Sequence, residues 1–194
     1  MIRAGHVGGI VTWNRDDFAE LGVEWYVPED TEWDEKGRTM ISHIYVSYDA
    51  TITSIQFGYY ENEALVLSER HGPPDNPGNF STEFVTRDVK LVQDEYVTGL
   101  SGNEDLLGGI CNLTFHTNLG KHGPIGKFKD NYPSGSKVFD SEIRDRRGFG
   151  GFFGSYNSNG LSSIGIYVSP TASSEKVVES ENVGLSQRLV APFQ

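Results

Sequence analysis

The side chains best suited to chemistry gather in one short segment, GFFGSYNSNGLSSIG, at residues 151–165. Asn157 and Asn159 carry amides that both donate and accept hydrogen bonds, and the hydroxyl of Ser162 can do the same. Gly160 allows a turn with positive φ, which would leave the backbone open to a ligand. These groups are better suited to binding a hydroxyl-rich molecule than to catalysis. The segment is therefore either a binding loop or a plain turn between two strands.

The rest of the chain offers no catalytic or metal-binding arrangement, so we expect no enzyme activity, no metal and no cofactor. None of the five histidines stands in an H-x-x-x-H motif or a Cys/His cluster, which argues against a zinc site. Cys111 stands alone among apolar neighbours, as is typical of a buried core thiol. The glycine-rich GFGGFFG departs from phosphate-binding spacing, because Phe153 occupies the last glycine position. Glu29 and Asp30 are adjacent and point apart on an extended chain, unlike the convergent carboxylates of a glycosidase.

Composition and charge exclude several classes of binding partner. The chain of 194 residues has a formal net charge of −11, which argues against nucleic acid and anionic membranes, because phosphate contacts need clustered Lys and Arg. We find neither an apolar run of about 18 residues nor the apolar stretch of a signal peptide. With one cysteine there is no intramolecular disulfide. We expect a cytoplasmic protein without a membrane span.

Alternating apolar and polar residues predict an all-β fold. In ISHIYVSYD, at residues 41–49, Ile44 and Val46 place apolar groups on one face while His43 points outward. Similar strand patterns, separated by connections rich in Gly and Pro, recur at residues 51–60, 63–69, 81–92, 96–102, 110–118, 148–156 and 161–170. Convincing helical periodicity does not occur. Hairpin-linked antiparallel strands are the expected elements.

Several motifs, in one order, resemble a known family. The chain contains TEWDEKG (31–37), ISHIYVSYDATITSIQFGY (41–59), HGPPDN (71–76), VTGLSG (97–102), NLTFHTNLGKHGPIG (112–126) and GFFGSYNSNGLSSIGIYVSP (151–170). This series resembles the jacalin-related lectins, whose corresponding signals include W-D-D-G, I-x-x-I-x-V-x-Y, S-L-T-F-x-T-N and G-F-F-G-R-S-G-x-x-L-D-x-I-G-x-Y. The similarity spans residues 25–170, which we expect to form one lectin domain. Residues 1–24 and 171–194 are then N- and C-terminal extensions.

The resemblance implies both a fold and an activity. Jacalin-related lectins form a β-prism of three four-stranded antiparallel sheets, so we expect this all-β architecture. They bind sugars without chemistry, and unprocessed single chains commonly take mannose/glucose-type glycans, of which we expect the mannose type here. Their sugar sits between a glycine-rich N-terminal turn and a G-x-x-x-D loop before the last strand. Because a single shallow site is weak and paired sites gain avidity, we also expect a homodimer.

Both walls of this implied sugar site depart from the family pattern. Leu161 matches the family's Leu, which puts Ser162 at the Asp position and Ser158 near the Gly position. On the other wall Trp25 matches the family's Trp, but the sequence YVPED puts Asp30 at a usual contact glycine. The resemblance thus implies a sugar site at Asp30, Ser158, Asn159, Gly160, Leu161 and Ser162.

The altered walls leave two functions open. A serine hydroxyl binds a sugar less strongly than an ionised carboxylate does, by about 1 kcal/mol or more, so Ser162 predicts a weaker site. Asp30 could return a carboxylate from the opposite wall, and Tyr156 or Trp25 could offer an apolar face to a pyranose ring. The alternative is a β-prism that has lost sugar binding and serves as a protein-interaction or structural module.

Overall fold

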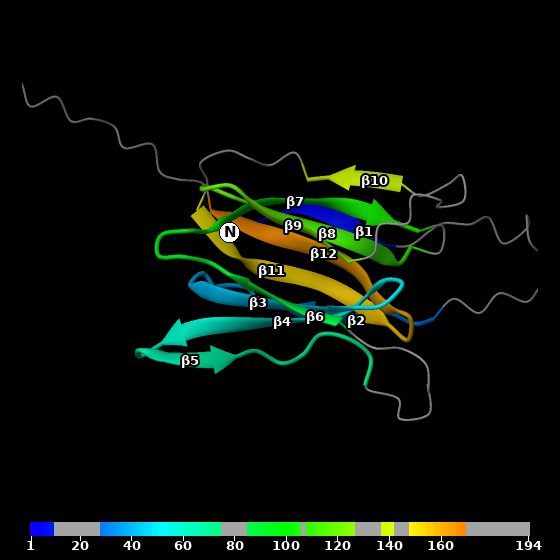
Figure 1. Ribbon diagram of the computed structural model, residues 1–194, viewed down its shortest axis with the longest axis horizontal. Helices are drawn as coiled ribbons and strands as arrows, with labels where there is room; N and C mark the ends of the chain where they lie inside the picture. The colour runs from blue at the N-terminus through cyan, green and yellow to red at the C-terminus, as the bar shows by residue number, and fades with distance from the viewer. Residues whose placement is uncertain (10–27, 75–84, 106–107, 127–136, 142–147, 170–194) are drawn as a thin grey trace, which may run out of the picture.

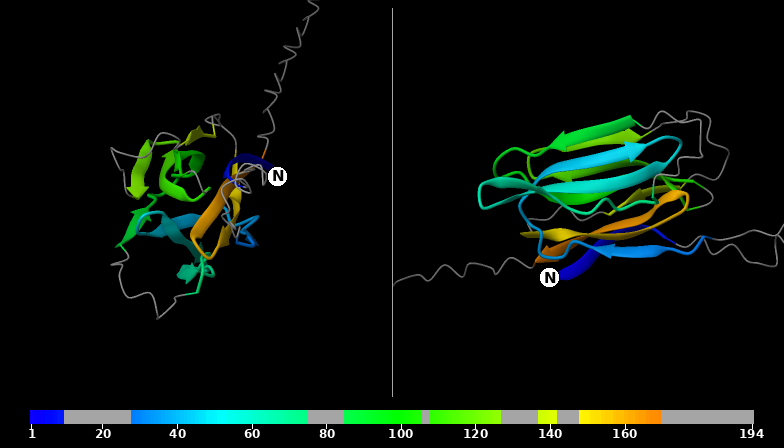
Figure 2. Two further views of the ribbon diagram at one scale, coloured as in Figure 1. Left: turned by 90° about the vertical axis from the view of Figure 1, so that its right-hand side faces the viewer. Right: turned by 90° about the horizontal axis from the view of Figure 1, so that it is seen from below.

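The computed structural model describes residues 1–9, 28–74, 85–105, 108–126, 137–141 and 148–169. These residues form strands and connections, and no helix among them is long and apolar enough to cross a membrane. The strands make three four-stranded sheets around a common centre, as Figure 2 shows in its left-hand view. The all-β prism expected from the resemblance is confirmed.

All three sheets are antiparallel, and each joins neighbours in sequence with strands from farther away (Figure 1). The first sheet has the order β1 (Ile2–Gly8), β12 (Gly160–Ser169), β11 (Gly148–Asn157) and β2 (Thr31–Asp34). The second has the order β10 (Lys137–Asp140), β7 (Val97–Glu104), β8 (Ile110–Thr117) and β9 (Lys121–Gly126). The third has the order β5 (Ala64–Leu67), β4 (Ile52–Glu61), β3 (Ile41–Tyr48) and β6 (Val85–Lys90).

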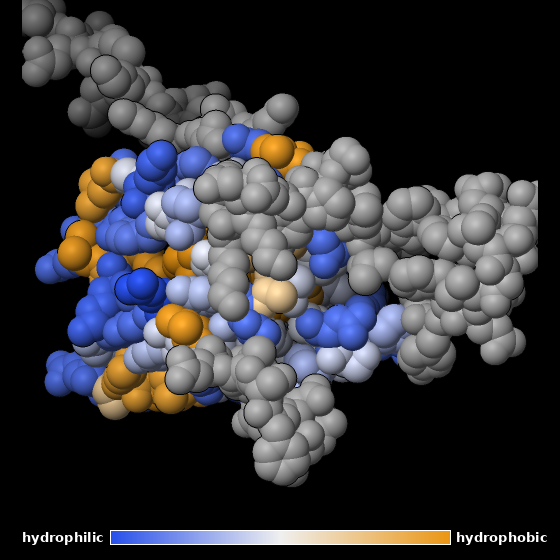
Figure 3. Space-filling model, turned by 45° about the vertical axis from the view of Figure 1, so that its right-hand side comes forward, coloured by the Kyte–Doolittle hydropathy of each residue, from blue (hydrophilic) through white to orange (hydrophobic). Residues whose placement is uncertain are grey.

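In strands such as β3, the alternation of the sequence separates residues that face the core from residues that face the surface. In β3, Ile44 and Val46 are fully buried, whereas His43 faces outward and stacks on Tyr45 with ring centroids 5.8 Å apart. On the face shown in Figure 3, the coloured residues are mostly hydrophilic, with smaller groups of hydrophobic ones between them. The strand patterns from residue 41 onward correspond to β3 to β8, β11 and β12, and Cys111 is buried, as expected. The Gly- and Pro-rich segment 120–137 was expected to be a connection, and this was wrong, because β9 lies in it. Gly and Pro are tolerated there because β9 is an edge strand, and the sequence does not predict β10 either.

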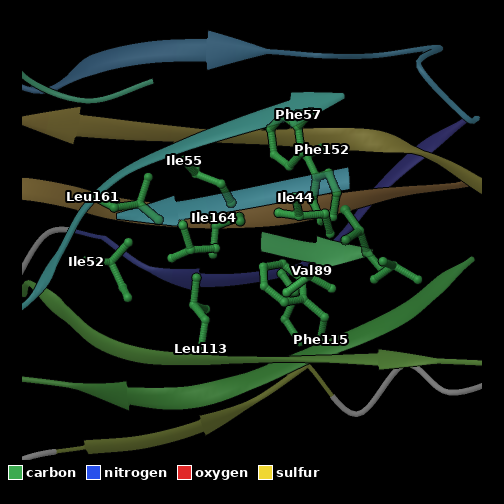
Figure 4. Packing of buried hydrophobic residues seen from close by; sticks show 14 of the residues in the cluster. Ile44, Ile52, Ile55, Phe57, Val89, Leu113, Phe115, Phe152, Leu161 and Ile164 are labelled. Atoms are coloured by element: carbon green, nitrogen blue, oxygen red, sulfur yellow. The ribbon is translucent and has the colours of Figure 1, made fainter. Parts of the chain in front are cut away.

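Three aromatic side chains, one from each sheet, join the sheets at the centre (Figure 4). Phe152 of the first sheet stacks on Phe57 of the third, with centroids 4.7 Å apart, and meets the ring of Phe115 of the second edge-on at 6.1 Å. All three are fully buried, and each contributes about 1.5–3 kcal/mol from the burial of apolar area. This packing fixes the sheets against one another, and with them the turns at their ends.

One strand of the first sheet lies within residues 1–24. Strand β1 pairs with β12 from Ile2 to Gly8, with a bulge between Ala4 and Val7. Its strand pattern is weak in the sequence because Gly5 and Gly8 adopt positive φ and the bulge interrupts the alternation. The sequence does not predict this strand. The expected boundary at residues 24 and 25, Trp25 and the segment 171–194 lie outside the described residues.

A network of side chains ties β1 to the far edge of the same sheet. Arg3 donates from Nε to the hydroxyl of Tyr167 over 2.9 Å, and that hydroxyl donates to Oδ2 of Asp34 over 2.7 Å. Arg3 also lies over the ring of Phe153, 4.6 Å from its centroid. Burial and the neighbouring Asp34 raise the pKa of Tyr167, so its hydroxyl keeps its proton and donates. The network holds the four strands of the first sheet together on their outer face.

Candidate functional site

The segment singled out in the sequence is a tight hairpin at one end of the prism. Asn157 of β11 pairs with Gly160 of β12, so only Ser158 and Asn159 form the turn, and both are exposed. Gly160 has a φ of 127°, and a Cβ there would collide with the backbone oxygen of Ile52. Glycine is therefore required at this position for two reasons, its φ and the close approach of β4.

The side chain of Asn157 organises the tip of this hairpin. Its Oδ1 accepts a hydrogen bond from the backbone N–H of Asn159 over 2.9 Å, and this bond closes an Asx-type turn. Its Nδ2 donates to Oδ1 of Asp30 over 2.9 Å. The N–H of Asn159 is thus committed within the turn, while the side chains of Ser158 and Asn159 remain at the surface.

Asp30 stands beside the hairpin although 127 positions separate it from Asn157. It lies there because β2 pairs with β11, with Thr31 opposite Tyr156. Asp30 is exposed, so its carboxylate can accept hydrogen bonds from a molecule at the hairpin. Because Glu29 and Glu32 are also exposed, three of the four residues at 29–32 present carboxylates; we call Glu29, Asp30 and Glu32 the acidic wall.

Ser162 lies beneath the surface, within a group of three serine hydroxyls. The register of β11 and β12 shifts between Ser155 and Tyr156, and this bulge brings Ser162 and Ser163 to the same side. Ser155 Oγ lies 2.8 Å from Ser162 Oγ and 2.7 Å from Ser163 Oγ. Ser162 is only 6% exposed, so its hydroxyl is part of this group and does not stand beside Asp30 at the rim.

Two glycines near the N-terminus also pack on this part of the hairpin. The N–H of Gly9 donates to the carbonyl oxygen of Ser162 over 2.9 Å, and a Cβ on Gly8 would collide with the same oxygen. Both glycines have positive φ, of 75° and 115°. The resemblance placed the family's glycine turn near Asp30, so sequence reasoning missed this glycine pair. The Gly-Gly dipeptide in HVGGI was the available signal.

Turns of the other two sheets lie at the same end of the prism. Thr51 follows β3, and its hydroxyl donates to the carbonyl oxygen of Asn159 over 3.3 Å. A Cβ on Gly109, in the turn between β7 and β8, would lie 3.1 Å from the methyl of Thr51. That turn is closed by Asp105, whose Oδ1 accepts from the N–H of Gly109 over 2.8 Å. Figure 1 shows the β3–β4 and β11–β12 turns together at the right-hand end of the molecule.

The implied site residues therefore divide into three groups. Asp30, Ser158 and Asn159 meet at the surface, with Asn157 between them, and Gly160 shapes their turn. Ser162 lies below them, and Leu161 is 1% exposed and belongs to the core. No group of three or more potential metal ligands occurs among the described residues. The arrangement can accept and donate hydrogen bonds, and no described residue of the site has the geometry of an activated nucleophile.

Comparison with known proteins agrees with the fold and the motifs. The Jacalin-like lectin domain matches residues 24–167. Jacalin-related lectin 24 of Arabidopsis thaliana is 48% identical over 167 residues, which cover 81% of this chain and 70% of that protein. Jacalin-related lectin 25 of the same plant is 46% identical over 181 residues, or 77% of this chain and 57% of that protein. The chain thus spans less than two thirds of the length of lectin 25.

Solved structures show the same fold at lower identity. The artocarpin–mannopentose complex has a TM-score of 0.59 and 23% identity, covering 87% of this chain and 97% of that one. A mannose-specific jacalin-related lectin from Morus nigra, in complex with mannose, has a TM-score of 0.57 and 23% identity, with 87% and 94% covered. The matched domain, the motif order and the three-sheet prism agree, and the chain belongs to the jacalin-like lectin family.

Proposed function

We propose that this domain binds carbohydrate without chemistry, at the hairpin tip and the adjoining Asp30. The single observation that carries the proposal is the bond from Asn157 to Asp30, which places an exposed carboxylate beside the turn before the last strand in a chain of the lectin family. Structural neighbours described as mannose-specific or bound to mannopentose favour mannose-type glycans as the ligand.

Asp30 is the strongest acceptor available to a sugar at this site. Sugar hydroxyls donating to an ionised carboxylate form charge-assisted hydrogen bonds, which are about twice as strong as neutral ones. The amide of Asn159 and the hydroxyl of Ser158 add neutral contacts, whereas Tyr156 packs partly against the core and leaves only part of its side chain for an apolar contact with a sugar. With Ser162 in place of the family's Asp, we expect an affinity in the millimolar to micromolar range, about 4–8 kcal/mol.

Calorimetric titration with mannose tests the proposal. Asp30→Asn should weaken binding about ten-fold because it removes the charge, and Asn159→Ala with Gly160→Val should abolish binding. Glu63→Gln is the matched control: this exposed acid lies in the β4–β5 turn, away from the hairpin, and the change should leave binding as it was. Mannose binding that survives both site variants unchanged would place the sugar elsewhere.

A gain of function provides a second test. Ser162→Asp restores the carboxylate of the family pattern, with a side chain one atom longer than that of serine. We expect mannose affinity to rise about ten-fold, while stability falls because a carboxylate enters a site that is 6% exposed. Unchanged affinity in a folded Ser162→Asp protein would show that this position does not face the sugar.

The second candidate function is a β-prism that acts as a protein-interaction or structural module. The buried hydroxyl group of Ser155, Ser162 and Ser163 favours it, because these serines bond one another where the family pattern carries a carboxylate. A glycan array separates the two candidates. Signal from mannose-type glycans that Asp30→Asn removes supports the lectin, and a blank array with correctly folded protein supports the module.

A further inference from the structure

We propose that the acidic wall makes this sugar site selective by charge: glycans with a protonated amine beside the bound sugar bind best, neutral glycans less, and glycans with a carboxylate or sulfate least. The inference rests on the proposed function and names the class of glycan that the site takes. It concerns long-range charge, whereas the hydrogen bonds to the sugar ring itself are those proposed above.

The acidic wall lies beside the hairpin and not merely near it in sequence. Asp30 accepts from Asn157 over 2.9 Å, and Glu32 pairs in register with Ser155 on β11. Because side chains alternate along an extended strand, Asp30 and Glu32 project to the same side of the first sheet. The carboxylates of Asp30 and Glu32 are therefore exposed on one side of the sheet, next to the part of β11 that leads into the hairpin, and Glu29 adjoins Asp30 in sequence.

Within the described part of the chain, no ion pair cancels this charge. The Lys and Arg residues that form ion pairs do so with other acids: Arg3 with Asp34, Arg38 with Glu61, and Lys90 with Asp88. Lys36, the cation nearest in sequence to the wall, has its ammonium 5.6 Å from the centroid of Tyr167. The formal net charge of −11 adds a field of the same sign.

The size of the effect follows from Coulomb's law. Two carboxylates about 8 Å from a charge on the ligand, across solvent, change its affinity about five-fold at low salt. The sign depends on the ligand, so a cation gains about what an anion loses. The Debye length falls from about 30 Å at 0.01 M salt to about 3 Å at 1 M, so the discrimination should vanish as salt rises.

The test uses three mannosides that share every ring hydroxyl and differ only in the group on the anomeric oxygen: 2-aminoethyl, ethyl and carboxymethyl. We expect calorimetry at about 0.01 M salt to rank them in that order, with steps of about five-fold, and to find them equal at about 1 M. If the ethyl mannoside binds and the other two bind with the same affinity, or with affinities in the reverse order, the inference about charge is wrong while the proposed function stands. Binding of none of the three overturns the proposed function as well.

Variants locate the source of the selectivity. Glu29→Gln with Glu32→Gln removes two charges and leaves the Asn157–Asp30 bond in place. The affinity for the ethyl mannoside should therefore stay the same. The ratio of the affinities for the 2-aminoethyl and carboxymethyl mannosides, which we call the span, should fall at least three-fold. Glu63→Gln, which removes one charge at the β4–β5 turn, is the control and should preserve the full span. If the wall variant also preserves it, the selectivity does not come from the acidic wall and the inference fails.

Discussion

Asn157 joins the two halves of the site through a single amide. It closes the hairpin turn with its oxygen and holds Asp30 with its nitrogen. Asn118 plays a comparable structural part at another turn: its Oδ1 accepts from the N–H of Tyr96 over 2.8 Å, and its Nδ2 donates to the carbonyl oxygen of Asp94 over 2.9 Å. The two asparagines thus allow stability and binding to be separated.

Asn157→Ala should lower both stability and sugar affinity. The loss of two exposed hydrogen bonds costs about 1 kcal/mol of unfolding free energy, and the release of Asp30 should weaken mannose binding at least five-fold. Asn118→Ala should cost a similar unfolding free energy and leave mannose binding intact. Urea unfolding and calorimetry on both proteins check this, and equal loss of binding in the two would contradict it.

At the level of residues, the sequence predicts the hairpin and its glycine but does not predict the contacts around them. The turn signal of Asn and Gly predicts a bend at Gly160 from local chemistry alone. The contact between Asp30 and Asn157 depends on the pairing of β2 with β11, and the burial of Ser162 depends on a bulge. Neither the strand pairing nor the bulge has a local sequence signal.

At the scale of elements, the site depends on close approach between turns of different sheets. Gly160 meets β4 at Ile52, and Thr51 bonds to Asn159, so the β3–β4 turn supports the hairpin from below. The strands that build these turns follow the alternation of their sequences. Strands β1 and β9 do not follow such alternation: glycines and a bulge interrupt it in β1, and Gly and Pro interrupt it in the edge strand β9.

Gly160→Ala should destabilise the protein by about 2 kcal/mol or more. The substitution places a Cβ at a φ of 127° and against the backbone oxygen of Ile52 in β4. Relief of this clash would require the backbone of the hairpin or of β4 to shift. Gly120→Ala is the control, because a Cβ at Gly120 meets nothing within 4 Å, and it should change stability by no more than about 0.5 kcal/mol. Comparable losses in urea unfolding would refute the steric account.

A second element-level feature predicts a pH dependence. Glu95, in the connection from β6 to β7, accepts from Thr117 over 2.7 Å, from His122 over 2.8 Å and from the N–H of Val92 over 3.1 Å. Burial opposes the charge, but these hydrogen bonds outweigh it and hold the pKa of Glu95 below its ordinary value. The connection between the second and third sheets is therefore fastened by an ionised carboxylate.

A carboxyl with a lowered folded pKa stabilises the protein above its unfolded pKa, and this contribution is lost as pH falls through the folded value. Glu95→Gln should therefore lower the melting temperature at neutral pH and lose less stability than the wild type as pH falls below about 4.3. Thermal unfolding followed by circular dichroism across this range checks the prediction. Parallel curves for the two proteins would mean that Glu95 contributes nothing to acid sensitivity.

At the scale of the whole molecule, the sequence predicted the prism through the order of its motifs, which no single strand pattern could do.

Self-association of the whole molecule remains a prediction. Tyr60, Leu65 and Leu67, on β4 and β5, are 54%, 45% and 51% exposed, which leaves apolar area at the edge of the third sheet. Pairing two weak sites can raise avidity about 10²–10⁴-fold without any new contact.

We expect light scattering to report twice the mass of one chain at high micromolar concentration. A dimer should bind multivalent mannose-type glycans far more tightly than mannose itself, whereas a monomer should show little difference. A strict monomer at these concentrations would contradict the expectation without bearing on the single site.

Strand β1 has a practical consequence for anyone who prepares this protein. A recombinant version trimmed to the family match at residues 24–167 would lack Ile2–Gly8, so β12 would become an open edge and Tyr167 would lose its bond from Arg3. It would also lose Gly9, which braces the hairpin at Ser162. An exposed edge strand can pair with other chains, so the trimmed protein should aggregate on expression. A purification tag fused at Met1 would directly precede a strand that is part of the first sheet.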